Sequence, residues 1–371
     1  MHKSAIVTGA GIVGLAMARA LAVRGYEVTV LDRARSAMGA SVRNFGMVWP
    51  IGQPDGDLYE RAVLSRGIWK QICDEAGAWY EEAGSLHLAY NTGEWSVLQE
   101  LAESYRHRNY QLLTVEQVQQ ISPYASITHL KGGLYSNQEL IVDPRKAIPV
   151  VKSWLEEKFN VQFINGCTVT DISYPDVYTA EEMYSADKIF VCSGADFETL
   201  YPGLMAEQPL VKCKLQMMRL HSPDAGNRIG PALCAGLSLI HYTSFRAAPS
   251  LPVLKQLYQE KMKEYLDLGI HVMVSQNQEG MLTVGDSHEY GDNPDPFDRS
   301  EINELILRYL ADFTNFGPVR IAETWNGVYA KLSNGDTELI LEPENGVTVV
   351  NGLGGAGMTL SFGLAESLMD A

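Results

Sequence analysis

Residues 4–14 read SAIVTGAGIVG, in which a short apolar run leads into Gly9, Gly11 and Gly14. The apolar run predicts a β-strand, and the small and apolar residues at helical spacing over Ile12–Ala22 predict a helix. In a turn of this G-x-G-x-x-G type, the first two glycines let the backbone turn against a pyrophosphate, and the third lets the helix pack on the strand. The stretch therefore predicts a dinucleotide-binding βαβ unit, with the diphosphate at the positive end of the helix.

A carboxylate completes this unit. Asp32 follows the second predicted strand, Glu27–Leu31, where its oxygens are placed to accept hydrogen bonds from ribose hydroxyls. An acid at this position also disfavours the additional phosphate of NADP. A glycine-rich turn followed by a solvated acid is the alternative, but it leaves the order of strand, turn, helix, strand and acid unexplained. We include the neighbouring Val13 and Arg33 in the predicted dinucleotide site.

Two further segments favour FAD over NAD. The segment 39–47, GASVRNFGM, has small residues that allow close approach to a second, flat part of a ligand. The segment 351–359, NGLGGAGMT, opens the last helix with free N–H groups, which stabilise the negative charge that an isoalloxazine gains on reduction. The residues predicted to surround the flavin and its diphosphate are Ser41, Asn44, Phe45, Gly46, Met47, Gly355, Gly357, Met358 and Thr359.

Length and composition predict a cytoplasmic protein of two domains. The chain has 371 residues, 46% of them apolar, and it contains neither an apolar run of the roughly 18 residues that span a bilayer nor a signal-peptide pattern at its start. A net charge of −16 repels polyanions, so we expect neither nucleic acid nor an anionic membrane as a partner. The five cysteines form no C-x-x-C pair, which predicts buried free thiols and no metal site.

The order of predicted elements indicates an α/β fold in which two domains exchange the chain. Beyond Pro209 the pattern becomes strand-rich, with strands predicted at 214–221, 238–244, 271–275 and 282–284. We expect a discontinuous, Rossmann-like FAD-binding domain and a substrate domain of the α+β kind, built on a mixed sheet. The FAD-binding domain is assigned residues 1–80, 140–205 and 323–371, and the substrate domain residues 81–139 and 206–322.

The separated motifs, together with residues 191–195 in mid-chain, resemble those of the D-amino-acid oxidase, glycine oxidase and sarcosine oxidase superfamily. The resemblance covers nearly the whole chain and implies bound FAD. It also implies that Val169 contacts adenine through its backbone and that Ser193 and Gly194 lie on the adenosine side.

Three other stretches resemble, within that superfamily, a subgroup associated with phosphonate breakdown; they are residues 241–245, 285–290 and 324–331. Covalently flavinylated sarcosine oxidases carry a cysteine in the segment that matches 325–332. This chain has none there, so we expect FAD to be bound non-covalently.

Candidate substrate-binding residues lie in and after the predicted substrate sheet. Tyr329 stands where glycine-oxidase-like relatives place an arginine that holds the substrate carboxylate, which makes a simple α-amino acid a less secure substrate. We take Tyr329, His241, His271 and Lys331 as the candidate catalytic residues. Further candidate anchors are Tyr242, Arg246 and His288.

Several of these residues also have a purely structural interpretation. A lone histidine in an apolar strand, such as His271, is more often a core residue. His241 and Tyr242 would point to opposite faces of their predicted strand, so only one of them would line the site. Lys212 and Lys214 share a strand face opposite Arg219, and a solvent-facing edge is the simplest interpretation of that lysine pair.

Three functions are compatible with these features. The first is FAD-dependent oxidation of the C–N bond of a small anionic amine or amino acid, N-methylated and phosphonate-bearing amines included, by hydride transfer to flavin N5 and hydrolysis of the imine. The second is oxidation of a 2-hydroxy acid, which residues 43–46 also resemble and which requires a general base such as a histidine. The third is flavin binding without catalysis. No motif identifies the electron acceptor, which is oxygen or another oxidant.

Overall fold

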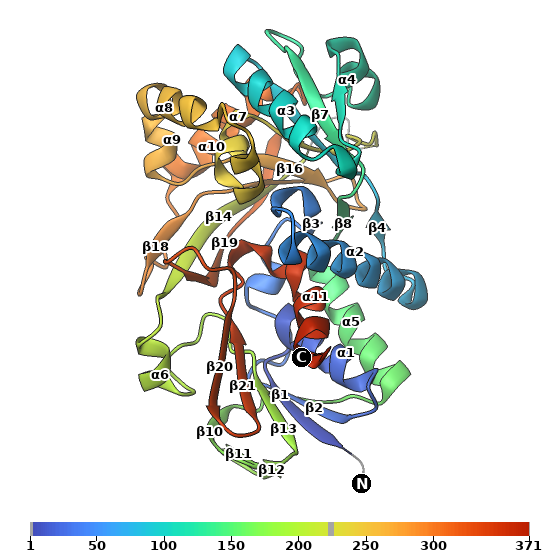
Figure 1. The fold of residues 1–371 in the computed structure, drawn as a ribbon, viewed down its shortest axis with the longest axis vertical. Coiled ribbons are helices and arrows are strands. Elements are labelled where there is room, and N and C mark those ends of the chain that lie inside the picture. The colour runs from blue at the N-terminus through green and yellow to red at the C-terminus, as the bar shows by residue number, and fades with distance from the viewer. Residues whose placement is uncertain (1–2, 222–225, 371) are drawn as a thin grey trace.

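The structure, a computed structural model, describes residues 3–221 and 226–370 and contains two large β-sheets, one in each half of the molecule (Figure 1). The first sheet has six strands in the order β20-β21-β13-β1-β2-β9. Its centre is parallel, because β1 pairs in parallel with β2 and with β13, whereas β20 runs antiparallel to β21. The strands are β1 (Ser4–Thr8), β2 (Glu27–Asp32), β9 (Gln162–Asn165), β13 (Lys188–Val191), β20 (Leu339–Glu344) and β21 (Val347–Asn351).

Four helices pack together in this half: α1 (Ile12–Ala22), α2 (Asp57–Ala76), α5 (Pro144–Phe159) and α11 (Gly357–Asp370). The last helix lies against both α1 and α2. A Cβ at Gly363 would lie 2.3 Å from the backbone oxygen of Arg61, so glycine is what lets α11 and α2 approach this closely. Beside this contact, Phe362 meets Trp69 edge to face with ring centroids 5.2 Å apart. Burial of each such side chain stabilises the fold by about 1.5–3 kcal/mol.

The second sheet has nine strands, ordered β18-β14-β17-β16-β15-β5-β7-β6, with β19 also pairing with β14. The longest strands, β14 and β19, are antiparallel along almost their full length. The strands are β5 (Ser85–Ala89), β6 (Gln111–Leu113), β7 (Gly132–Ser136), β14 (Leu210–His221), β15 (Ala232–Cys234), β16 (Met273–Gln276), β17 (Leu282–Gly285), β18 (Glu289–Gly291) and β19 (Arg320–Leu332).

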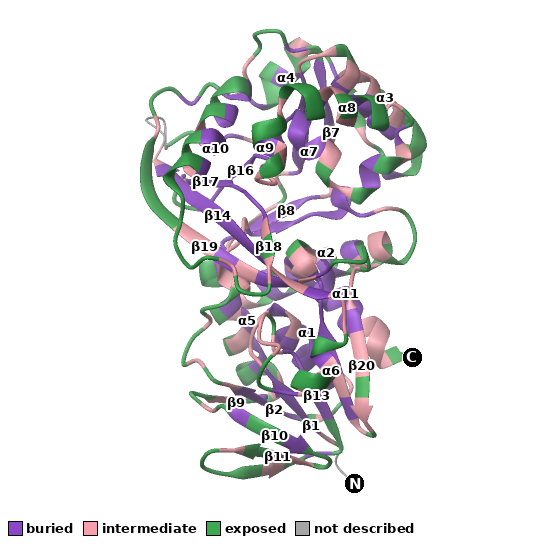
Figure 2. Cartoon of the chain, turned by 90° about the vertical axis from the view of Figure 1, so that its left-hand side faces the viewer, coloured by how far each residue is buried: buried purple, intermediate pink, exposed green. Residues whose placement is uncertain are grey.

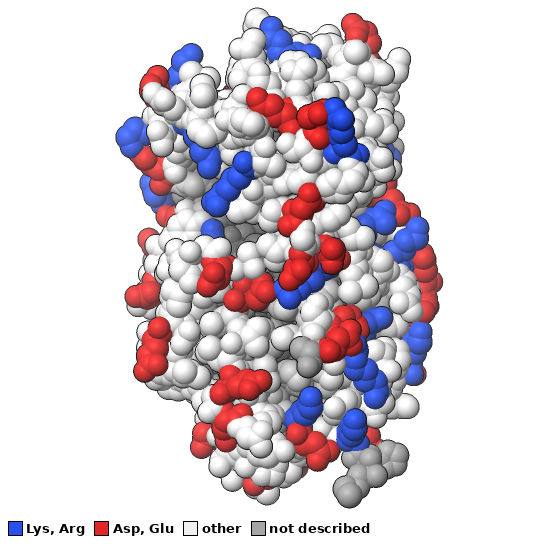
Figure 3. Space-filling view, viewed as in Figure 1, with Lys and Arg blue, Asp and Glu red and all other residues white. Residues whose placement is uncertain are grey.

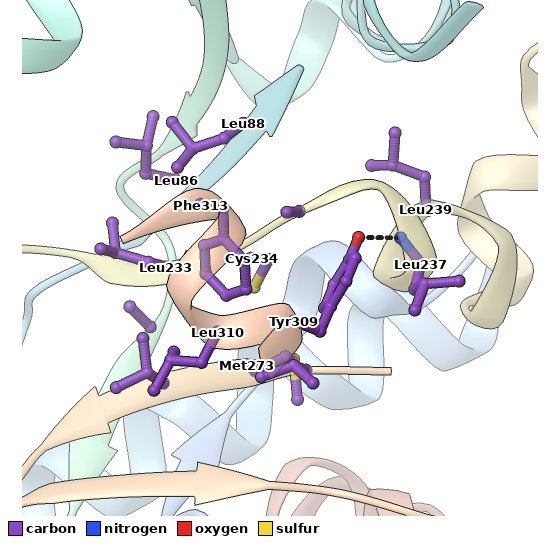
Figure 4. Packing of buried hydrophobic residues seen from close by; sticks show 14 of the residues in the cluster. Leu86, Leu88, Leu233, Cys234, Leu237, Leu239, Met273, Tyr309, Leu310 and Phe313 are labelled. Carbon is purple, nitrogen blue, oxygen red and sulfur yellow. Dashed lines mark hydrogen bonds between the residues drawn. The ribbon is translucent and has the colours of Figure 1, made fainter. Parts of the chain in front are cut away.

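Helix α10 (Ser300–Phe313) anchors the core of the second half. Figure 4 shows its Tyr309, Leu310 and Phe313 gathered with side chains of β15 and of α7 (Gly236–His241). The Leu237 N–H donates to the Tyr309 hydroxyl at 2.9 Å, which ties α7 to α10. The remaining helices are α3 (Thr92–Ser104), α4 (Val115–Ile121), α6 (Pro202–Ala206), α8 (Leu251–Lys261) and α9 (Lys263–Asp267).

Two three-stranded sheets and several short helices complete the fold. One three-stranded sheet has the order β3-β8-β4, from β3 (Met47–Val48), β4 (Tyr80–Glu81) and β8 (Leu140–Val142). Another is formed by β10 (Val169–Ser173), β11 (Asp176–Thr179) and β12 (Met183–Ser185). The short 3-10 helices are η1 (Ala40–Val42), η2 (Pro50–Gly52), η3 (Arg106–Arg108), η4 (Thr243–Ala247) and η5 (Gly354–Ala356). Burial is concentrated in the two large sheets, and the β10-β11-β12 edge is largely exposed (Figure 2).

The structure corrects one predicted strand and shifts another. The stretch predicted as a strand at 238–244 forms helix α7 followed by η4. Both Leu237 and Leu239 of α7 are fully buried, and so short an apolar run cannot distinguish a helix from a strand by its spacing. His271 precedes β16 rather than lying inside it.

We propose that the two sheets correspond to the two expected domains, with one adjustment. The expected boundary at residue 323 passes through β19, whose pairing with β14 joins it to the second sheet. We therefore assign β19 to the substrate half.

The surface carries charged side chains of both signs (Figure 3), and the cysteines form no disulfides. Acidic and basic side chains are interspersed on the face shown in Figure 3. None of the helices in the described part of the chain is long and apolar enough to cross a membrane. All five cysteines are free thiols; four are buried and Cys167 is half-buried.

Candidate functional site

The glycine turn after β1 is closely packed. Gly9 has φ +100°, and a Cβ there would lie 2.4 Å from the backbone oxygen of Cys192. A Cβ at Gly14 would lie 1.8 Å from the backbone oxygen of Gly9, so α1 can only approach the turn with glycine at this position. The N-cap of α1 is Gly11, which has no side chain with which to cap the first turn. No side chain of the N-cap residue therefore occupies the amide groups of this helix end, which leaves amides beyond Ile12 free for an anionic group such as a diphosphate.

Asp32 is held beside this turn by the backbone. Its Oδ2 accepts the Ala10 N–H at 2.6 Å and its Oδ1 accepts the Ala34 N–H at 2.7 Å. Each carboxylate oxygen keeps a further lone pair, which suits ribose hydroxyls. Arg33 instead forms an ion pair with Asp196 at 2.5 Å, with its own side chain 64% exposed.

The residues predicted to lie on the adenosine side follow or precede strands near Asp32. The Cys167 N–H donates to the Asp32 carbonyl at 2.9 Å, and Val169 follows at the start of β10. The Ser193 hydroxyl donates to the Asp196 carbonyl at 2.8 Å, and Asn351 donates to the Gly194 carbonyl at 2.9 Å. The structure thus gathers Asp32, Val169, Ser193 and Gly194 at the end of the first sheet.

Asn44 shapes the segment predicted to receive the flavin. Its amide group donates to the Ala40 and Ser41 carbonyls at 2.9 and 3.0 Å, and its Oδ1 accepts the Gly46 N–H at 2.8 Å. The Ser41 hydroxyl in turn accepts the Ile12 N–H at 2.9 Å, which joins this segment to the start of α1. Asn44 therefore holds the turn that leads to Phe45 and Met47.

The C-terminal glycine segment lies against the same region. The Trp49 N–H donates to the Thr359 hydroxyl at 3.0 Å, and the Trp69 indole donates to the Met358 carbonyl at 2.8 Å. A Cβ at Gly357 would lie 3.4 Å from Ile12, so α1 and α11 begin side by side. The N-termini of α1 and α11 thus lie together with the two glycine-rich turns that precede them, and we call this arrangement the frame. The frame suits the diphosphate and the reduced ring of a flavin dinucleotide.

Tyr329 and Lys331 project from β19 toward this frame. A Cβ at Gly355 would lie 3.5 Å from the Tyr329 hydroxyl, and a Cβ at Gly354 would lie 3.7 Å from the Lys331 side chain. The Lys331 ammonium donates to the Tyr290 hydroxyl at 3.1 Å. Burial raises the pKa of Tyr329 well above its usual range, so its phenol stays protonated and can donate a hydrogen bond.

Three histidines from separate segments meet near these residues, and we call His241, His271 and His288 the histidine group. The His241 and His271 ring centroids are 3.7 Å apart, and the His271 and His288 rings stack at 5.2 Å. The His271 Nε2 lies 3.1 Å from the Asp286 carboxylate. The structure therefore brings together the predicted His241 and His271 with His288.

Burial sets the protonation of this group. It lowers the pKa of all three imidazoles, in the case of His288 to about 4, and the positive charge of Lys331 lowers them further. Burial also raises the pKa of Asp286 well above its usual range. His241 nevertheless keeps solvent-accessible surface, so its ring is surrounded by protein and open on one side. All three imidazoles are neutral at pH 7.

The remaining predicted cations lie elsewhere. Arg246 is exposed on η4, and Lys212 pairs with Glu198 at 2.6 Å. The interpretation of Lys214 as part of a solvent-facing edge is wrong, because its side chain is 1% exposed and lies 3.6 Å from Asp298. Packing of α10 and the loop before it against β14 buries this lysine, and its ammonium also donates to the Phe297 carbonyl.

Sequence reasoning gave no role to two residues of this region. Asp286 orients His271, and its position two residues before His288, just after a buried strand, was an available signal. Arg219 is 7% exposed and makes no ion pair with another described residue. A charged residue in the apolar run of β14 was the signal for it.

Comparison with known proteins identifies the family of the chain. A family model described as FAD dependent oxidoreductase matches residues 4–371. The tRNA 5-methylaminomethyl-2-thiouridine biosynthesis bifunctional protein MnmC of Pseudomonas entomophila is 27% identical over 242 residues, which cover 63% of this chain and 36% of that protein. The glycine oxidase of Pseudomonas aeruginosa is 26% identical over 231 residues, which cover 59% of this chain and 62% of that protein. The match thus covers less than two thirds of either relative.

Solved structures share the fold over the whole chain. The L-proline dehydrogenase from P. horikoshii matches with a TM-score of 0.81 at 19% identity, covering 100% of this chain and 92% of that one. The glycine oxidase from Geobacillus kaustophilus matches with a TM-score of 0.76 at 17% identity, covering 100% and 94%. The expected α/β fold and the expected FAD cofactor are confirmed. The chain therefore belongs to the family of FAD-dependent oxidoreductases.

Proposed function

We propose that this enzyme oxidises the C–N bond of a small amine or amino acid that carries an anionic group. The observation that carries the proposal is the placement of Tyr329 and Lys331 against Gly354 and Gly355, beside the frame that suits FAD. An ammonium and phenol groups next to a hydride acceptor are suited to hold an anion while the adjacent carbon reacts.

The residues have distinct tasks in this reaction. Lys331 holds the anionic end, and the hydroxyls of Tyr290 and Tyr329 donate hydrogen bonds to it. Bound FAD supplies the hydride acceptor. The substrate reacts with its amine neutral, because the nitrogen lone pair must assist departure of the hydride. The resulting imine is hydrolysed by water to a carbonyl product and an amine or ammonia.

The anionic group is a carboxylate or a phosphonate in this proposal. The resemblance of residues 241–245, 285–290 and 324–331 to a phosphonate-associated subgroup supports the phosphonate, and the match to a glycine oxidase supports the carboxylate. Tyr329 in place of an arginine leaves an ammonium and two phenol groups, rather than a bidentate guanidinium, as the donors to the anionic group.

Anaerobic bleaching of the flavin tests the proposal. The holoenzyme is mixed with matched pairs: N-methylglycine and N-methylaminomethylphosphonate, their unmethylated forms, and N-methylethylamine as the amine without an anionic group. We expect bleaching by anionic amines and little by the neutral one. Equal bleaching by N-methylethylamine would exclude the anionic anchor, and no bleaching by any amine would exclude C–N oxidation.

One observation favours a second candidate, oxidation of a 2-hydroxy acid. The His271 imidazole and the Asp286 carboxylate form a pair at 3.1 Å, the arrangement of a general base and its orienting acid. Adding glycolate and lactate to the same bleaching panel tests it. Bleaching by these hydroxy acids alone would replace the amine proposal.

A further inference from the structure

Three separate segments position the histidine group. His241 ends α7, His271 precedes β16, and His288 follows β17. The last two segments are joined by backbone hydrogen bonds: His271 N–H to the Asp286 carbonyl at 3.2 Å, Asp286 N–H to the His271 carbonyl at 2.9 Å, and His288 N–H to the Leu268 carbonyl at 3.0 Å. The two histidines are therefore fixed on one side of a rigid backbone pairing, and their rings stack with an interplanar angle of 13°.

One nitrogen of each imidazole lies within 4.8 Å of the other two. Nitrogen ligands of a tetrahedral zinc ion are about 3.3 Å apart, since each Zn–N bond is about 2.0–2.1 Å long. The largest of these separations therefore exceeds the spacing in a bound site by at most about 1.5 Å.

The protonation pattern of His288 favours a cation over an anion. Its Nδ1 lies 2.9 Å from the Gly269 carbonyl, and a carbonyl can only accept, so Nδ1 carries the hydrogen. The neutral ring then presents a lone pair at Nε2. A lone pair repels an anion and binds a metal ion.

His271 offers the same chemistry. Its Nε2 faces the Asp286 carboxylate at 3.1 Å, while its Nδ1 is buried without a hydrogen-bond partner, and the whole residue is only 4% exposed. A buried imidazole nitrogen without a partner costs free energy unless a ligand occupies it.

The surroundings resemble the supporting groups of metal sites. Metal-binding histidines usually have their second ring nitrogen beside a backbone carbonyl or a carboxylate; the His288 Nδ1–H donates to the Gly269 carbonyl, and the His271 Nε2 lies 3.1 Å from the Asp286 carboxyl group. Gly269 has φ +59°, and a Cβ there would lie 2.7 Å from the Cβ of His288, so glycine is required for this contact.

We propose that His241, His271 and His288 bind a divalent transition-metal ion, of which Zn²⁺ is the best match for three imidazoles. The ion enters from the open side of His241. Three protein ligands leave a fourth coordination position on that side, where water or an anionic group binds. This site is additional to FAD and does not depend on which amine the enzyme oxidises.

Zinc content of the holoenzyme tests the site. The FAD-loaded protein is treated with a chelator, dialysed against Zn²⁺ and analysed by mass spectrometry for bound zinc, with flavin absorbance as the measure of intact fold. We expect stoichiometric zinc in the wild type and loss of zinc in His271→Ala and His288→Ala. Asp286→Asn should weaken zinc binding by about 10–100-fold while all three ligands remain. His129→Asn, an exposed histidine outside the group, is the matched control and should retain zinc.

His241→Asn keeps the test decisive if the buried variants do not fold, because this ring is open on one side. Absence of stoichiometric zinc in the wild type, or unchanged zinc in folded His241→Asn and His288→Ala, would overturn the proposal. Methylphosphonate binding to the metal-free holoenzyme, measured by calorimetry and abolished by His288→Ala, would assign the group to an anion instead and also overturn it. Flavin bleaching by amines is scored separately, so the two proposals fail independently.

Discussion

Replacing Lys331 with methionine tests the anionic anchor most directly. Methionine keeps the length and apolar stem of lysine but removes the ammonium that donates to Tyr290 at 3.1 Å. Hydrogen bonds to charged groups contribute about 1.5–3 kcal/mol, and solvent screening at this half-exposed side chain reduces that to about 1–2 kcal/mol. We therefore expect substrate to bind about 5–30-fold more weakly.

Stopped-flow reduction of the flavin under anaerobic conditions separates binding from chemistry. The observed rate is measured against the concentration of an anionic amine that bleaches the wild type, which gives a dissociation constant and a limiting rate. We expect Lys331→Met to raise the dissociation constant and to change the limiting rate much less, because the ammonium holds the anionic end in substrate and transition state alike.

Two controls make the result specific. Lys212→Met removes a half-buried lysine from the neighbouring strand β14, where it pairs with Glu198, and should leave the dissociation constant unchanged. An amine without an anionic group should bind the wild type and Lys331→Met equally. If Lys331→Met and the wild type bind the anionic amine with the same dissociation constant, Lys331 is not the anchor and the reasoning fails.

Three further outcomes are expected. Gly14→Val should abolish FAD binding, because its Cβ would overlap the Gly9 carbonyl at 1.8 Å; a folded variant that purifies with full flavin absorbance would contradict the turn's role. Acid precipitation should release all the flavin into the supernatant, and flavin that stays with the pellet would show a covalent bond. Burial lowers the pKa of His87 from 6.5 to about 3, so the unfolded chain binds this proton first and the free energy of unfolding falls as pH falls from 6.5 toward 3. In urea unfolding at several pH values, His87→Phe should therefore show a shallower acid loss than the wild type, and an identical slope would contradict this.

Local patterns predicted the dinucleotide half of the molecule well. The expected strand 4–8 and helix Ile12–Ala22 agree with β1 and α1 to the residue. The contact of Gly14 with the Gly9 carbonyl spans only five residues, and such a local contact can be read from sequence spacing. The position of Asp32 after the next strand follows from the same short-range geometry.

The histidine group could not be predicted in this way. His271 lies 30 residues after His241 and 17 residues before His288, and the three meet only because β16 and β17 pair and α7 packs on α10. The error at 238–244 has the same origin, since burial of Leu237 and Leu239 against α10 makes that run helical. Packing between residues far apart in the sequence determines both the histidine group and the helix at 238–244. A single sequence indicates such packing only through the types of residue that come together in the fold.

Arg219 and Trp325 are polar side chains of the second sheet whose surroundings the sequence alone did not predict. The Arg219 Nε and the Trp325 indole N–H are both buried without hydrogen-bond partners, and the guanidinium lies 5.9 Å from the centre of the indole ring. Trp325 packs in the same cluster as Phe45, which belongs to the segment that suits the flavin. The Arg219 Nη2 donates to the Thr283 hydroxyl at 3.5 Å, and the guanidinium makes no ion pair with another described residue, so this buried cation is only weakly compensated. A ligand that supplied an electron-rich group to it would stabilise the folded protein by about 2.7 kcal/mol at a hundredfold excess over its dissociation constant.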